Sequence, residues 1–217
     1  MSDRVILAFG DSNTHGASAI APDETWVRYG PEIRWPTRLA GLLGAGWQVV
    51  EEGLPGRTTV FDDPISGAHK NGLRVLPAIL ETHAPVDLVI LMLGTNDLKA
   101  RFSLPAEDIA KGVARLVTEI RRMGAGPAGG NPDILIVAPA PILETGVPGP
   151  RMAGGAAKSR RLAALYAELA ARTGCGFFDA GTVAEVDPMD GIHLTPGAHE
   201  RLADALAAEL REWGEKP

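Results

Sequence analysis

Residues 5–16, VILAFGDSNTHG, join a short apolar run to a cluster of turn-forming residues. The run VILAF contains no polar residue, which is typical of a strand covered on both faces of a sheet. Gly, Asp, Ser and Asn favour turns, so GDSN alone predicts only that the strand ends there. The alternative is that Ser12, at the tip of the strand, is a nucleophile. The rest of the sequence bears on which interpretation holds.

Four more apolar runs predict strands, and stretches with helical spacing of apolar residues lie between them. The last helix is expected to begin at Thr195, as N-cap, and Pro196. Alternating strands and helices predict an open parallel α/β sheet with helices on both faces. The 217 residues fit a single domain, 1–217. Including the first run, the predicted strands are 5–9, 47–52, 88–93, 134–138 and 176–180.

The composition excludes several classes of protein. The formal net charge is −6 and no block of Lys or Arg is present, so nucleic acid and anionic membranes are poor partners. A single cysteine leaves no internal disulfide. The apolar run near the N-terminus is too short for a signal peptide, and none approaches the roughly 20 residues of a membrane span. We expect a cytoplasmic protein with no membrane partner.

Residues suited to acyl transfer follow the predicted strands, at the edge where open α/β sheets bind ligands. Ser12 supplies a hydroxyl, His193 can take its proton, and Asp190 can hold the imidazole. A backbone N–H at Gly53 and the amide of Asn96 can donate to a developing oxyanion. The G-x-S-x-G elbow of α/β-hydrolases is absent, so another class of serine hydrolase is required.

The blocks FGDSNTHG, EEGLPGRTT, MLGTND and DGIH resemble the four signature blocks of the SGNH (GDSL-like) hydrolase family. Their order along residues 4–210 makes the resemblance specific. It implies a flavodoxin-like three-layer α/β/α fold with a five-stranded parallel sheet in the order 2-1-3-4-5. It also implies catalytic Ser12, Asp190 and His193, with an oxyanion hole from the Ser12 N–H, the Gly53 N–H and the Asn96 side chain.

A narrower resemblance is to the bacterial arylesterase branch of this family, through VVEEGLPGRTT, HAPVDLVILMLGTNDLKARF and FFDAG. It implies a serine esterase that hydrolyses small aryl or alkyl esters through an acyl-enzyme, without metal or organic cofactor. Acyl transfer to alcohols or hydrogen peroxide is an implied side activity. The resemblance also implies a homo-oligomer, as large as an octamer, and loops 61–72 and 139–157 are the candidate subunit contacts.

The sequence departs from the family close to the nucleophile. Asn13 replaces the usual leucine, and His15 stands near a position that is often aromatic in the branch, so both are candidates for a more polar or more open substrate pocket. Asp97 and Arg57 are expected to brace their loops. His199, inside the last helix, is expected at the surface.

Other functions remain as alternatives. Within the family these are a carbohydrate acetyl esterase, a thioesterase or a lysophospholipase. A metallophosphoesterase would need several His and Asp ligands, whereas only His193 has a carboxylate three residues before it on a loop. A non-catalytic flavodoxin-like binding module is the last alternative, because a fold alone does not define a function.

Overall fold

A computed structural model describes residues 4–214. Its five strands are all parallel and lie in the order β2-β1-β3-β4-β5, as the family resemblance implies. The strands are β1 (Arg4–Gly10), β2 (Trp47–Gly53), β3 (Leu88–Met92), β4 (Asp133–Ala138) and β5 (Gly176–Asp179). The helices are α1 (Ser12–His15), α2 (Trp35–Leu43), α3 (Gly72–His83), α4 (Ala106–Met123), α5 (Gly155–Thr173) and α6 (Pro196–Gly214).

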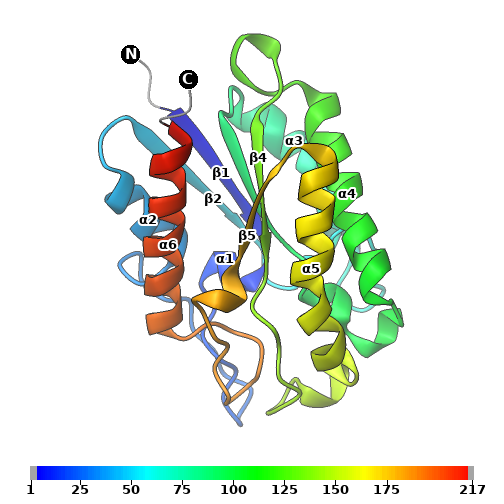
Figure 1. The fold of residues 1–217 in the computed structure, drawn as a ribbon. Coiled ribbons are helices and arrows are strands. Elements are labelled where there is room, and N and C mark those ends of the chain that lie inside the picture. Colours follow the sequence, from blue (N-terminus) through cyan, green and yellow to red (C-terminus); the bar gives the residue numbers. More distant parts are fainter. Residues whose placement is uncertain (1–3, 215–217) are drawn as a thin grey trace.

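The helices form a layer on each face of the sheet (Figure 1). Helices α2 and α6 pack on one face, where Trp35 and Leu39 meet the apolar stripe of α6. Helices α3, α4 and α5 cover the other face. Because both faces are covered, the central strands β3 and β4 are almost entirely buried, as continuous apolar runs require.

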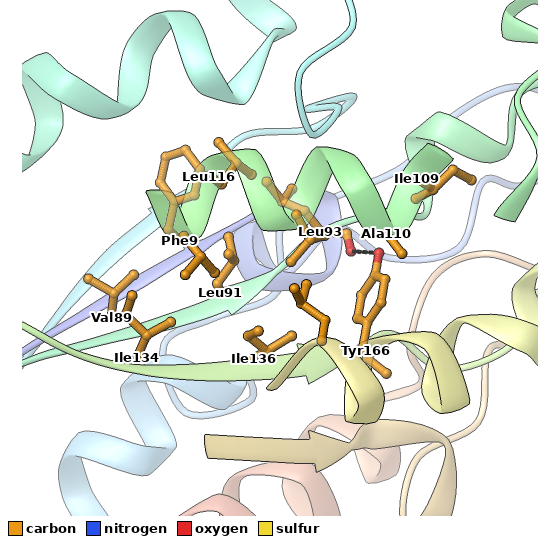
Figure 2. Packing of buried hydrophobic residues seen from close by; sticks show 14 of the residues in the cluster. Phe9, Val89, Leu91, Leu93, Ile109, Ala110, Leu116, Ile134, Ile136 and Tyr166 are labelled. Atoms are coloured by element: carbon orange, nitrogen blue, oxygen red, sulfur yellow. Dashed lines mark hydrogen bonds between the residues drawn. The ribbon is translucent and has the colours of Figure 1, made fainter. Parts of the chain in front are cut away.

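The larger core cluster lies between the sheet and the α3–α5 layer (Figure 2). The stripe from Ile109 to Ile120 on α4 faces inward, so the helical spacing in the sequence correctly identifies the buried side. Tyr166 of α5 is fully buried, and its hydroxyl donates to the carbonyl of Leu93 at 2.9 Å, just beyond β3. Burial of this ring therefore also satisfies a backbone acceptor near the candidate site.

One local expectation needs correction. Strands β2 and β5 are only partly buried, because they are the edges of the sheet and each lacks a neighbour on one side. The predicted start of α6 is confirmed, since the Thr195 hydroxyl accepts from the N–H of Ala198 at 3.1 Å.

All five strands end at one edge, the lower edge in Figure 1. Gly10 pairs in register with Gly53 of β2 and Met92 of β3, so the residues that follow these three strands are neighbours. The long connections 17–31, 61–72 and 139–157 also reach this edge, since each contributes to the lining of one pocket there. In the part of the chain described, no helix combines the length and the apolar character needed to cross a bilayer.

Candidate active site

Ser12 is the first residue of the short helix α1, directly beyond β1. Asp11 is its N-cap, and one carboxylate oxygen accepts from the N–H of Asn13 at 2.9 Å. Gly16 ends the helix in the left-handed conformation. The N–H of the first helical residue has no intrahelical acceptor, so the Ser12 N–H can donate to another group. The stretch GDSN therefore forms a turn and also fixes the serine at the sheet edge.

Gly53 brings the end of β2 against α1. A Cβ atom at this position would lie 2.1 Å from the backbone nitrogen of His15, so no larger residue fits without movement of one backbone. Arg57 braces the same region, because its Nη1 donates to the carbonyl of Gly10 at 2.9 Å and to the carbonyl of Glu52. This confirms the bracing role expected for Arg57.

Asn96 begins a short 3₁₀ turn beyond β3, and its Nδ2 donates to Asp11 Oδ2 at 3.4 Å. An amide has two N–H donors, so one stays available to the site.

The next residue, Asp97, accepts from the N–H and the hydroxyl of Thr59, which confirms that it braces its loop. Burial raises the pKa of Asp97 to about 7, although the Thr59 hydrogen bonds oppose the shift and Asp11 adds to it. Burial also raises the pKa of Asp11.

Asp190 and His193 form a hydrogen-bonded pair on the loop before α6. Asp190 Oδ2 lies 2.5 Å from His193 Nδ1, and Oδ1 accepts from the N–H groups of Ile192 and His193 at 2.9 and 3.0 Å. Burial favours the neutral acid, but the imidazole and these backbone donors outweigh burial and lower the pKa of Asp190 to about 2. The carboxylate holds Nδ1, which leaves Nε2 for the substrate side.

Ser12, Asn96 and His193 line one pocket with a volume of about 200 Å³. The three side chains come from three different loops at the sheet edge, and each is almost fully buried. Apolar side chains, among them Ile20 and Ile192, form part of the wall. The structure thus brings the sequence-predicted nucleophile, base and oxyanion-hole amide together at one small cavity, with Gly53 packed directly behind α1.

Asn13 and His15, both candidates for the substrate pocket, are not among the residues that line this cavity. Asn13 points to the histidine loop: its Nδ2 donates to the carbonyl of Ile192 at 3.1 Å, and its Oδ1 accepts from the N–H of Leu194 at 2.9 Å. The ring of His15 meets Trp26 edge-on, with centroids 6.3 Å apart. Both residues therefore support groups near the pocket without facing its interior.

His199 is also placed differently from the expectation, because it is fully buried between α6 and α2. Its Nδ1 accepts from the N–H of Trp35 at 3.4 Å, and its ring meets Tyr29 edge-on. Burial is the main cause that lowers the pKa of His199 to about 4, and the positive charge of Arg34 adds to the shift. A helical residue with apolar partners at i+3 and i+7 faces inward, which is the signal that marks position 199 as buried.

Several groups at the site were not predicted. The N–H of Ile20 donates to Asp190 Oδ2 at 2.9 Å, so the 17–31 loop holds the acid. Trp26, from the same loop, also lines the pocket; the sequence leaves this residue unassigned among core, pocket and subunit-contact roles. Backbone donors leave no trace in a sequence. The cationic residues Lys99, Arg101 and Arg151 also line the pocket, and the only sequence signal for the first two is their position just after GTND.

Within residues 4–214, no group of three or more His, Cys, Asp or Glu side chains is arranged to hold a metal ion. The donor set of a metallophosphoesterase is thus not assembled in this part of the chain.

Comparison with known proteins identifies the class. The model of the GDSL-like lipase/acylhydrolase family matches residues 8–201. The Mycobacterium smegmatis aryl esterase structure is 41% identical, with a TM-score of 0.89, covering 96% of this chain and 99% of that one. Est24, a carbohydrate acetylesterase from Sinorhizobium meliloti, is 38% identical, with a TM-score of 0.91 and coverage of 97% and 100%. No curated protein sequence matches significantly. This chain belongs to the GDSL-like lipase/acylhydrolase family, and so to the carboxylic ester hydrolases.

Proposed function

We propose that this protein hydrolyses small carboxylic esters through an acyl-enzyme on Ser12. The observation that supports the proposal is the pocket itself, in which Ser12, Asn96 and His193 meet while Asp190 holds the far side of the imidazole. A cavity of about 200 Å³ favours a short acyl group and a small aryl or alkyl leaving group. The M. smegmatis relative is an aryl esterase, which agrees with such a substrate.

In the proposed reaction, His193 Nε2 takes the proton of Ser12 as Oγ attacks the ester carbonyl. Negative charge develops on the carbonyl oxygen, where the N–H groups of Ser12 and Gly53 and the amide of Asn96 stabilise it. The alcohol or phenol leaves with the proton from His193. Water then repeats the sequence and releases the acid, and Asp190 stays ionised throughout, consistent with its low pKa.

Two finer activities follow from the same acyl-enzyme. An alcohol or hydrogen peroxide that replaces water in the second step would make the protein an acyltransferase. The likeness to a carbohydrate acetylesterase favours acetylated sugars as a second candidate substrate. Acetate release from acetylated xylose, compared with release from phenyl acetate, distinguishes the two substrate classes.

The test of the main proposal is p-nitrophenol release from p-nitrophenyl acetate and longer esters. Ser12→Ala should abolish turnover, because the nucleophile is lost. Asn96→Ala should lower kcat by about 10²–10³, the effect of removing one oxyanion donor. The activity of the native protein should be the same with and without EDTA.

Thermal unfolding of each variant is the control, since both variants must fold like the native protein. Substantial turnover by folded Ser12→Ala would refute the nucleophile assignment. Near-normal kcat in Asn96→Ala would refute the oxyanion assignment. Chelator-sensitive activity on phosphate esters would instead support the metallophosphoesterase.

A further inference from the structure

One wall of the catalytic pocket is strongly cationic. Lys99 and Arg101 follow the Asn96 turn, and Arg151 comes from the 139–157 loop, yet all three line the same cavity as Ser12 and His193. No Asp or Glu is among the residues that line it. Hydrolysis of a neutral ester needs no cation at this place, because the oxyanion donors and the triad are already complete.

A single carboxylate opposes these charges, and it lies beneath the wall. Asp63 is buried; its Oδ2 is 3.2 Å from Lys99 Nζ, and its Oδ1 is 3.2 Å from Arg101 Nη1. The N–H groups of Ile65 and Ser66 also donate to Oδ1, at 2.9 and 3.1 Å. Asp63 therefore holds the two cations in place but neutralises only one positive charge of the three.

Arg151 is the third cation, and Asp63 does not pair with it. Among the residues that the structure describes, no other side chain forms a hydrogen bond or ion pair with its guanidinium. Arg151 is exposed and lines the pocket. Burial lowers the pKa of Lys99, and repulsion from Arg101 and Arg151 adds to the shift while Asp63 opposes it. The cations are thus close enough to act on one another, and an anion between them would relieve this repulsion.

We propose that the substrate is a small ester carrying a carboxylate, which Arg151 and Arg101 bind while Lys99 supplies further positive charge. A guanidinium fork matches a carboxylate in a bidentate geometry. The three cations lie beside the nucleophile, so the charge is recognised on the same small molecule whose ester bond is cleaved. This inference rests on the proposed esterase function and specifies its substrate class.

Two matched pairs of esters test the proposal on the native protein. In the first pair, 4-acetoxybenzoate and 4-acetoxybenzamide, the charge on the leaving phenol differs, and the intrinsic leaving-group ability favours the amide, so a preference for the carboxylate cannot come from reactivity. In the second, the phenyl monoester of glutaric acid and its neutral monoamide, only the charge on the acyl group differs. At low salt, kcat/KM for the carboxylate in at least one pair should exceed that for its amide about tenfold, and salt should reduce this advantage. Rates are corrected for uncatalysed hydrolysis.

Arg151→Gln should raise KM for the preferred carboxylate about fivefold, within the range for a partly exposed charged hydrogen bond. The rise in KM should be clearly smaller for the neutral amide than for the carboxylate. Arg172→Gln is the control, because it removes the same charge from an exposed pair with Glu168 in the last turn of α5.

The possible outcomes distinguish the anionic-substrate proposal from the esterase proposal. Ser12-dependent hydrolysis with no preference for a carboxylate in either pair overturns the anionic-substrate proposal and leaves the esterase standing. An equal effect of Arg151→Gln and Arg172→Gln overturns it as well. Absence of hydrolysis of every ester, charged or neutral, overturns the proposed function itself.

Discussion

At the scale of single residues, Asn13 links the two ends of the candidate active site. It follows Ser12 directly, and its side chain holds the backbone on both sides of His193, at Ile192 and Leu194. The proposed nucleophile and the proposed base are therefore placed relative to each other through one amide. The family's usual leucine could not make either hydrogen bond, because its side chain has no polar atom.

We expect Asn13→Ala to lower kcat for p-nitrophenyl acetate about tenfold while KM changes less than twofold, since small displacements of catalytic groups are costly. Two buried backbone groups also lose their partner, so the free energy of unfolding should fall by about 1–3 kcal/mol. Steady-state kinetics and urea unfolding measure the two effects.

Asn71→Ala is the matched control for Asn13→Ala. Asn71 caps α3 and donates to the carbonyl of Val60, so its loss should lower stability in the same way. It makes no contact with the histidine loop, and kcat should be unchanged. If both variants lose stability but neither loses kcat, Asn13 has no role in placing His193.

At the scale of elements, the approach of β2 to α1 depends on the absence of a side chain at Gly53. In Gly53→Ala the new methyl group would collide with the α1 backbone near His15. We expect a loss of about 2 kcal/mol or more in the free energy of unfolding, with a loss of esterase activity because Ser12 moves.

Gly41→Ala is the control for Gly53→Ala, because the same substitution should here raise the free energy of unfolding. Gly41 lies in α2, is exposed, and has no atom within 4 Å of an added Cβ. Alanine there should stabilise the protein by roughly 0.5–1 kcal/mol through helix propensity. Urea unfolding of both variants tests the pair, and equal stability changes would show that Gly53 is not sterically constrained.

Elements and candidate catalytic residues were more predictable from the sequence than the pocket wall. Apolar runs mark the strands, the partly buried edge strands β2 and β5 included, so all five are found within one residue of their predicted bounds. The motifs likewise identify Ser12, Asn96 and His193, which do meet in the structure. The pocket candidates Asn13 and His15 are not among the residues that line the cavity, because neighbours in sequence on a four-residue helix point in different directions. Contacts between distant loops, such as Ile20 with Asp190, leave no local pattern.

At the scale of the whole molecule, buried His199 makes stability depend on pH. Its pKa is about 4 in the folded protein and about 6.5 when unfolded, so the unfolded state binds the extra proton as the pH falls. The contribution is complete above pH 6.5 and is lost between about pH 6.5 and 4. Asp97, whose pKa is raised, acts in the opposite direction between about pH 4 and 7.

The substitution His199→Gln isolates this contribution, because glutamine offers an acceptor but does not titrate. Between pH 7 and pH 4.5 the native protein should lose roughly 2 kcal/mol more in the free energy of unfolding than the variant. Urea unfolding at the two pH values measures the difference. A native protein and a variant with parallel pH dependence would contradict a neutral, buried His199.

Exposed apolar side chains also gather at the carboxyl edge of the sheet, and Ile65 and Val147 of the 61–72 and 139–157 loops are among them. Subunit contact through these loops stays a prediction.

The clamp between Asn13 and the histidine loop also has a consequence for biosynthesis. The proposed nucleophile is synthesised long before its base, because Asn13 and the Leu194 N–H that it accepts from are 181 residues apart in the chain. A nascent chain that stops before His193 therefore lacks its base. Hydrolytic activity requires that translation has passed this loop, so shorter products should be inert toward the esters around them.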